Sequence, residues 1–250
     1  MTSETLFLVV AAFFIVAAIY SMAGFGGGSS YLAILAMTGL THQSIPPIAL
    51  VCNLIVAGGG VIHFAKEGHL SLKKVFPFVI LSVPMAYWGG TLSISKDVFS
   101  CLLGFCLLAA AGRVLMKDDR FNKPREVSSA ETWSIGLPGG AILGYLSGVV
   151  GIGGGIFLSP LLLILRWVDV RQAAACASFF IVVNSLAGLG GHWHKAAIDP
   201  QLLLLLGTAV FLGGQIGSRL GAIHLPKPML RRVLAVLVAS VAVKMLMSLA

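Results

Sequence analysis

The sequence contains few charged residues, and none of its acidic residues lies within a long apolar run. Charged residues make up 10% of the 250-residue chain, whereas hydrophobic residues make up 58%. This balance excludes a soluble globular domain and predicts an all-α polytopic membrane protein. All nine Asp and Glu residues fall at the termini or in loops between apolar segments. We therefore expect no carboxylate proton relay and no carboxylate cation site within the bilayer.

Features of several other protein classes are also missing. The net charge of +8 comes mostly from short loops between apolar runs, which is typical of membrane topology and argues against nucleic acid as a partner. No basic region precedes the first apolar segment, so we expect that segment to be retained and not cleaved as a signal peptide. We predict no metal site and no cofactor, because the cysteines lack metal-ligand spacing and suit small buried side chains: Cys52, Cys101, Cys106 and Cys176.

One glycine-rich stretch occurs twice, at residues 24–30 and again at residues 151–157. Each stretch is flanked by two apolar segments that look too short for ordinary membrane spans. Each therefore predicts the tip of a helical hairpin held inside the bilayer. Glycine allows the backbone to approach a ligand closely, and a helix that starts there offers unpaired N–H groups and a positive dipole end. Such a tip can hold an anion without a charged side chain.

The two halves of the chain align as repeats. Gly24 matches Gly151 at a shift of 127 residues, and Asn53 matches Asn184 at a shift of 131 residues. Internal repeats of this kind commonly build transporters. The predicted segments are repeat 1 (1–116), with a hairpin at 6–40 and helices at 48–64, 75–92 and 98–116; a cytoplasmic linker (117–133); and repeat 2 (134–250), with a hairpin at 134–165 and helices at 173–191, 201–223 and 233–249.

Charge counting predicts that the repeats are inverted. If each hairpin returns to the side it left, each half makes an odd number of net crossings. The loops with most of the Lys and Arg then all face the cytoplasm and both termini lie outside: 65–74, 117–133, 166–172 and 224–232. Four crossings per half would put one of the basic loops outside. Re-entrant hairpins and pairs of thin, tilted spans give the same sidedness, so both stay open.

We predict a substrate site formed by the two tips together with polar side chains of the apolar segments. Asn53 and Asn184 suit either ligand donation or a hydrogen bond between helices, and Asn184 ranks first because it follows the better-formed tip. Gln215 is a further donor candidate. The predicted site residues are Gly26, Gly27, Gly28, Ser29, Ser30, Asn53, Gly153, Gly154, Gly155, Ile156, Asn184 and Gln215.

Three more polar residues are candidates for a proton-transfer or gating role. His63 and His194 match between the repeats but lie near segment ends, where a wet interfacial histidine is the simpler interpretation. Arg219 lies about one turn from a basic loop, so it suits snorkelling to the cytoplasmic surface better than clamping a substrate.

The glycine tips, the paired halves and the basic middle loop resemble the TauE/SafE sulfite exporter family, also called the toluene sulfonate uptake permease family. The resemblance covers nearly the whole chain, and the doubled Gly-x-Gly-Gly-Gly is its most specific part. It implies an inner-membrane carrier in a bacterium or archaeon that moves sulfite, sulfoacetate or related organosulfonates. One departure is Ala33, which stands where the second repeat has Pro160.

Two other functions compete with a carrier. A passive anion channel could use the same donors to line a pore. An intramembrane hydrolase could use Ser178, His192 and His194, but no Gly-x-Ser-x-Gly and no His-Glu-x-x-His occurs, so we predict no enzyme activity and no catalytic residues. A coupled proton or sodium ion and a homodimer stay open.

Overall fold

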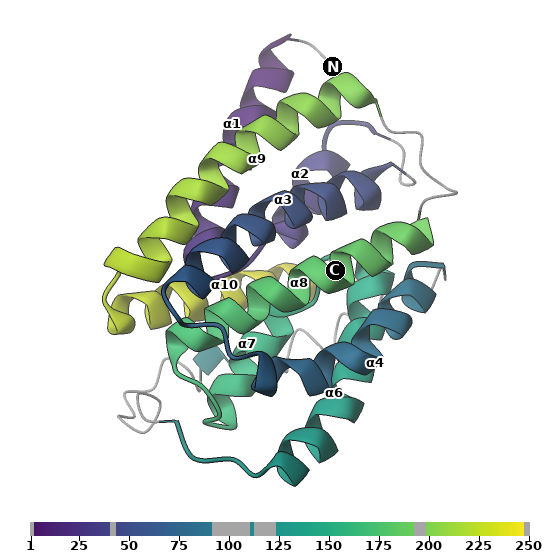
Figure 1. Ribbon diagram of the computed structural model, residues 1–250. Coiled ribbons are helices and arrows are strands. Elements are labelled where there is room, and N and C mark those ends of the chain that lie inside the picture. Colours follow the sequence, from purple (N-terminus) through teal and green to yellow (C-terminus); the bar gives the residue numbers. More distant parts are fainter. Residues whose placement is uncertain (1–2, 41–43, 92–110, 113–123, 193–198, 248–250) are drawn as a thin grey trace.

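The computed structural model describes residues 3–40, 44–91, 111–112, 124–192 and 199–247. The elements in these ranges are helices (Figure 1): α1 (Ser3–Met22), α2 (Gly28–Ala36), α3 (Ile45–Lys66), α4 (Leu72–Thr91), α6 (Ser129–Val150), α7 (Gly155–Ile164), α8 (Val170–His192), α9 (Pro200–Arg219), the π-helical turn η3 (Leu220–His224) and α10 (Lys227–Met247). Residues 111–112 are helical as well. Within the described part, five segments are long and apolar enough to cross a membrane: α1, α3, α6, α8, and α9 together with η3. The all-helical prediction is confirmed for these residues.

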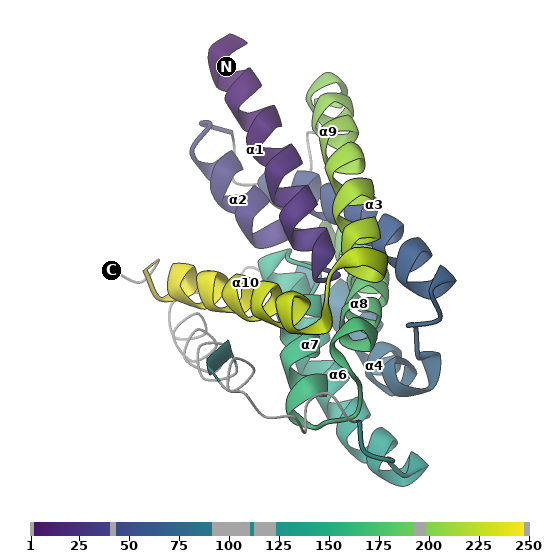
Figure 2. The same ribbon diagram turned by 90° about the vertical axis from the view of Figure 1, so that its left-hand side faces the viewer.

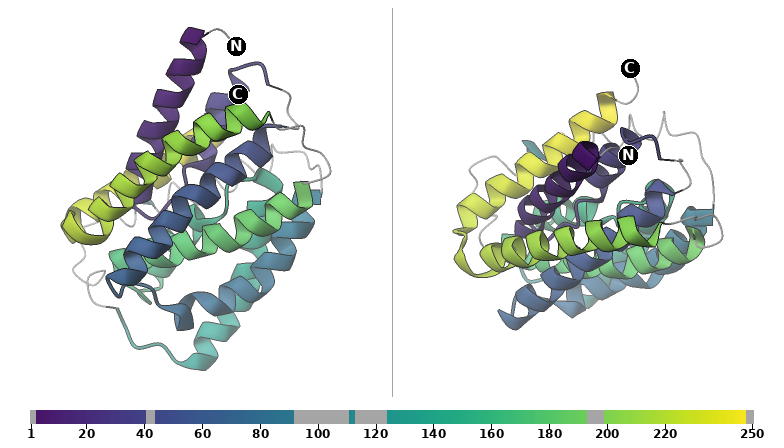
Figure 3. Two further views of the ribbon diagram at one scale, coloured as in Figure 1. Left: turned by 45° about the horizontal axis from the view of Figure 1, so that its top comes forward. Right: turned by 90° about the horizontal axis from the view of Figure 1, so that it is seen from above.

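The two halves form the same pairs of packed helices. The first helix of each half packs against the fourth helix of the other half. Helix α1 packs against α9, and α6 packs against α4. Helices α3 and α8 contact each other between these outer pairs (Figure 3, left). Each short helix packs on the long helix that follows it, α2 on α3 and α7 on α8.

Glycines allow the outer pairs to pack closely. A Cβ placed on Gly217 of α9 would lie 1.9 Å from the carbonyl oxygen of Ala18 in α1. A Cβ on Gly140 of α6 would lie 2.0 Å from the carbonyl oxygen of Phe78 in α4. Further glycines at four-residue spacing continue both contacts, as in other membrane helix pairs: Gly213 on α9, Gly221 on η3, and Gly144 and Gly148 on α6.

The two hairpins come from opposite ends of the molecule. Figure 2 shows α1 and α9 at one end and α6 at the other. The glycine tips that follow α1 and α6 lie near the middle. Helix α2 turns back toward the end from which α1 comes, and α7 turns back toward the end from which α6 comes (Figure 2).

The described parts of the basic loops gather at a single end of the molecule, where α3, α9 and α7 finish (Figure 1). Hydrogen bonds connect the described parts of four loops that lie far apart in the sequence. They join Lys74 to the carbonyl of Trp167, Arg125 to the carbonyl of Leu165, Arg171 to the carbonyls of Ile223 and Leu225, and Lys227 to the carboxylate of Asp169. Positive charges near the C-terminal ends of helices also interact favourably with the helix dipoles.

Several helices begin earlier than predicted, and three of them illustrate why. Helix α6 begins at Ser129 and not at residue 134, because Ser128 caps it by accepting a hydrogen bond of 3.2 Å from the N–H of Glu131. Helix α3 begins at Ile45, because prolines in a first turn lack only an N–H that the helix does not use. Helix α10 begins at Lys227. The prediction of loop structure was therefore wrong for residues 129–133 and 227–232.

The lengths of the hairpin helices also correct the prediction. Helices α1 and α6 have 20 and 22 residues, so at about 1.5 Å per residue each can cross a bilayer. Only the second helices are too short, since α2 has 9 residues and α7 has 10. The helix predicted at 98–116 falls outside the described residues except for Ala111 and Gly112.

Candidate functional site

The two tips share a backbone conformation that requires glycine. Gly24 and Gly151 both have φ of 75°, and Gly27 and Gly154 have φ of 92° and 74°. L residues with a side chain rarely adopt these left-handed values. Gly27 and Gly154 are the N-cap residues of α2 and α7, and no side chain caps either helix. The first-turn N–H groups of both short helices therefore lie at the tips without a side-chain acceptor.

Asn53 of α3 lies where the two tips meet. A Cβ on Gly26 would lie 2.3 Å from Oδ1 of Asn53, and a Cβ on Gly28 would lie 2.4 Å from Nδ2 of Asn53. Gly153 of the second tip is also beside this amide, since a Cβ there would lie 3.4 Å from Nδ2. Asn53 is fully buried. Both tips therefore converge on one amide side chain.

Buried polar atoms without partners surround this meeting point. Neither Oδ1 nor Nδ2 of Asn53 has a hydrogen-bond partner among the described residues, and the same holds for Oγ of Ser147 and Ser185. A Cβ on Gly153 would lie 2.9 Å from Ser185 Oγ, and a Cβ on Gly154 would lie 3.3 Å from Ser147 Oγ. An unpaired buried polar group costs about 1–3 kcal/mol, so a group of them indicates a place for a polar ligand or water.

A small cavity separates the tips. Its walls are Tyr20, Phe25, Gly26, Gly27, Gly28, Ser29, Ile152, Ile156 and Ile181. The cavity has a volume of only about 10 Å³, which is room for about one water molecule. A polyatomic ligand can therefore enter only if the tips move apart.

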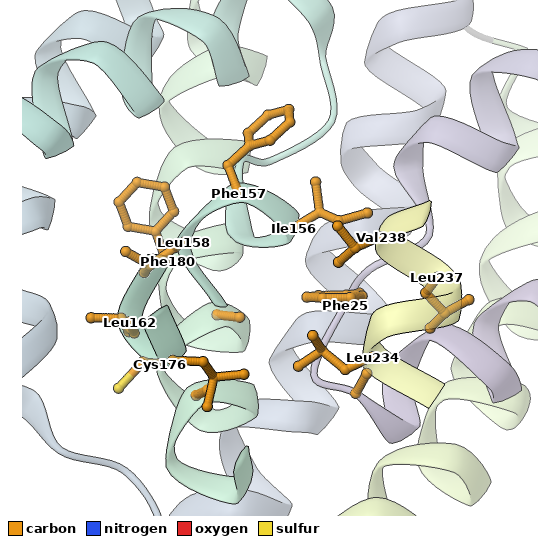
Figure 4. Close-up of a cluster of buried hydrophobic side chains, with 14 of the residues drawn as sticks. Phe25, Ile156, Phe157, Leu158, Leu162, Cys176, Phe180, Leu234, Leu237 and Val238 are labelled. Atoms are coloured by element: carbon orange, nitrogen blue, oxygen red, sulfur yellow. The ribbon is translucent and has the colours of Figure 1, made fainter. Parts of the chain in front are cut away.

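Apolar side chains occupy one side of the gap between the tips. Figure 4 shows Phe25 of the first tip with Ile156 of the second tip and Val238 of α10 on one side of its ring and Leu234 of α10 on the other. All four side chains are buried. Because the side chain of Ile156 belongs to this apolar contact, only its backbone N–H can serve a polar ligand.

The predicted donors Asn184 and Ser30 already have partners. Nδ2 of Asn184 donates to the carbonyl oxygen of Phe180 in its own helix at 2.8 Å, which leaves only Oδ1 unpaired. The hydroxyl of Ser30 donates to the hydroxyl of Tyr20 at 2.9 Å. The geometry therefore favours Asn53 over Asn184 as the amide that faces both tips.

Gln215 and His63 pair with each other and do not line the cavity. His63 Nε2 lies 2.8 Å from Gln215 Oε1, which joins α3 to α9. Arg219 is exposed, as expected for a side chain that snorkels. His194 lies outside the described residues, so its predicted role is not addressed by the structure.

Four residues near the tips were not predicted from the sequence. Ser147 and Ser185 lie beside the second tip, as described above. Ser178 donates to the carbonyl oxygen of Gly24 at 3.0 Å, which ties the first tip to α8. Lys244 donates to the carbonyl oxygen of Ser29 at 2.7 Å. Lys244 had a usable signal, because it is a basic residue within an apolar segment.

Comparison with known proteins identifies the family. The profile of the sulfite exporter TauE/SafE family matches residues 9–245. The chain belongs to this family. A probable membrane transporter protein, y4hK of Sinorhizobium fredii (strain NBRC 101917 / NGR234), is 33% identical over 98% of this chain and 100% of its own length.

More distant relatives of this TauE/SafE protein carry similar names. The probable membrane transporter protein ORF9 of a Sinorhizobium species is 28% identical over 85% of this chain and 81% of its own. The probable membrane transporter protein YunE of Bacillus subtilis (strain 168) is 22% identical over 79% of this chain and 82% of its own. No solved structure matches. Family membership and the apolar helices together make the protein a multi-pass membrane transporter.

Proposed function

We propose that this TauE/SafE transporter is a carrier of small sulfur-containing anions, such as sulfite, sulfoacetate or other organosulfonates. The anionic head group binds between the two glycine-rich tips. The observation that carries this proposal is the convergence of both tips on the buried, unpaired amide of Asn53.

The chemistry of the tips favours an anion over a cation. The N-termini of α2 and α7 both begin at the tips, and each contributes roughly 0.3–2 kcal/mol to binding a negative charge. Asn53 Nδ2 and the hydroxyls of Ser147 and Ser185 are further donors for oxyanion oxygens. No residue that lines the cavity is acidic. A dianion is harder to desolvate, so a coupled proton or sodium ion would ease its passage.

The arrangement of the hairpins supports a carrier with alternating access. We propose inverted repeats, with the tips near the bilayer midplane, the basic end in the cytoplasm and both termini outside the inner membrane. The opposite directions of α1 and α6 (Figure 2) and the matching helix pairs of the two halves support the inversion. The gathering of the basic loops at one end supports the sidedness. Because the closed cavity has room for only about one water molecule, transport requires the tips to separate.

Flux measurements with the purified protein in liposomes test the carrier. We expect uptake of radiolabelled sulfite or sulfoacetate that saturates with concentration and is stimulated by the same anion on the other side of the membrane. Linear flux with unitary currents would instead identify a passive channel. Equal transport of acetate, or tighter binding of Zn²⁺ than of sulfur oxyanions, would contradict the proposed substrate class.

A further inference from the structure

We propose that Lys244 supplies the fixed positive charge that pairs with the substrate anion at the first tip. This inference rests on the proposed function and adds to it a residue outside the glycine tips. A site made only of backbone N–H groups, hydroxyls and amides provides partial charges. A lysine beside it provides a full one.

The contact of Lys244 places its ammonium group next to the site. Its Nζ lies 2.7 Å from the carbonyl oxygen of Ser29, and Ser29 is one of the residues that line the cavity between the tips. Ser29 also belongs to the first turn of α2, whose N-terminus is at the first tip. The ammonium group therefore contacts a residue of the cavity wall, although Lys244 is not itself among the lining residues.

The register of α10 directs Lys244 inward. Leu234, Leu237 and Val241 are buried members of the core, and Lys244 continues their spacing of three and four residues. Residues at this spacing share one face of a helix. Figure 4 shows Leu234 and Val238 of this helix on the side of Phe25 in the first tip. Lys244 is partly buried and lies at the end of this inner face, so it does not point toward lipid.

No negative charge in the described part of the chain pairs with Lys244. It donates to the neutral carbonyl of Ser29, and the neighbouring hydroxyls of Ser30 and Tyr20 bond to each other. A charged side chain within an apolar helix is costly and usually has a functional role. An ammonium group has three N–H donors, so it can keep the Ser29 contact and still bind an oxyanion. Lysine and monoanion together form a neutral pair, which lowers the cost of removing the anion from water.

A basic residue also occurs at the equivalent sequence position of the first repeat. The shift of 131 residues that relates Asn53 to Asn184 also relates Arg113 to Lys244, and Leu115 and Met116 to Leu246 and Met247. Arg113 lies outside the described residues, so this match is one of sequence only. It shows that a cation recurs at the same register of the last predicted helix of each repeat.

Anion titration of the purified full-length protein tests this role. Isothermal titration with sulfite and with methanesulfonate compares the wild type with Lys244→Gln and Lys244→Arg. We expect Lys244→Gln to bind both anions about tenfold or more weakly, because a hydrogen bond to a charged group is lost. Lys244→Arg keeps the charge, and we expect its affinity to stay within about threefold of the wild type. Lys73→Gln, an exposed lysine at the basic end, is the matched control for net charge.

A charge-rescue experiment keeps the test valid if Lys244→Gln folds poorly. Lys244→Cys is treated with a cationic aminoethylthiol reagent or with a neutral methylthiol reagent, and the wild type receives both treatments as a control for the native cysteines. We expect only the cationic adduct to recover binding. Unchanged affinity in Lys244→Gln, or equal recovery by both reagents, would overturn the role of Lys244 while wild-type binding upholds the proposed function. Failure of the wild type to bind either anion would reject both.

Discussion

Gly153 of the second tip lies so close to Asn53 of the first half that a Cβ on this glycine would be 3.4 Å from the amide nitrogen. The first tip lies against the same amide through Gly26 and Gly28. One side chain of α3 therefore contacts both repeats at the point where two short helices begin. This relationship makes Asn53 the most informative residue to change.

Replacement of Asn53 should weaken anion binding more than replacement of Asn184. Asn53→Asp puts a negative charge between the tips, and we expect it to reduce sulfite affinity by more than about tenfold. Asn184→Asp is the matched control, because Nδ2 of Asn184 already donates within its own helix. Titration calorimetry measures both. A larger loss in the Asn184 variant would show that the second repeat holds the ligand instead.

Side chains at the tips should stop transport. In Gly154→Ala the new Cβ would lie 2.9 Å from the ring of Phe180, at a φ of 74° that already disfavours alanine. We expect transport to fall by more than about tenfold. The protein should still reach the membrane, because the left-handed backbone strain costs only about 1–2 kcal/mol.

Gly68→Ala is the control for backbone strain at the tips. Gly68 has a φ of 72° and nothing within 4 Å of a new Cβ, so this variant carries the strain without the crowding. We expect it to transport normally in the same liposome assay. Equal losses in the Gly154 and Gly68 variants would mean that crowding at the tip is not the cause.

Within the described residues the sequence predicted the existence of the helices and of the two glycine turns, because glycine runs and apolar lengths are local signals. It misplaced the starts of α6 and α10, where a capping serine and a first-turn proline extend the helices into polar sequence. Ser147 and Ser185 could not be selected, since serines in apolar helices commonly bond to their own backbone and only tertiary packing shows which ones do not. The pairing of His63 with Gln215 likewise depends on how α3 crosses α9.

That pairing should be visible as a coupling energy. Loss of either His63 or Gln215 leaves the other without its partner, at a cost of about 1–3 kcal/mol in stability. We expect His63→Leu and Gln215→Leu each to destabilise the protein, and the double variant to be less destabilised than the sum by about 0.5–3 kcal/mol. Thermal unfolding in detergent measures the cycle. Strictly additive effects would show that the 2.8 Å contact contributes nothing.

The contact between α1 and α9 should tolerate no added side-chain atom at Gly217. Its Cβ would lie 1.9 Å from a backbone oxygen, which cannot rotate away. We expect Gly217→Ala to lower stability by about 1–3 kcal/mol or to prevent folding. Gly207→Ala on the same helix meets only a flexible side-chain atom of Ile55 at 3.3 Å and should be nearly neutral. Similar melting temperatures for the two variants would contradict this packing.

Low pH should reduce the folding stability of the protein, because the Asp169 carboxylate at the basic end becomes protonated. Burial alone would raise the pKa of this carboxylate, but the N–H of Gln172 and the ammonium of Lys227 outweigh it, so its pKa is lowered. A lowered folded pKa adds stability above the unfolded value of about 3.9, and this stability is lost as pH falls through the folded pKa. Asp169→Asn keeps an N-cap residue and removes the charge. We expect its melting temperature to fall less than that of the wild type between about pH 7 and about pH 3; parallel curves would contradict this.

The most direct test of the account is the position of a bound anion. A structure determined with sulfoacetate, or with selenite so that anomalous scattering locates the heavy atom, shows where the head group rests. We predict that it lies between Gly28 and Gly153, within hydrogen-bonding distance of Asn53 Nδ2, with the tips further apart than in the closed state. An anion bound instead beside Arg171 and Lys227 at the basic end, with the tips empty at a concentration that saturates transport, would contradict the account.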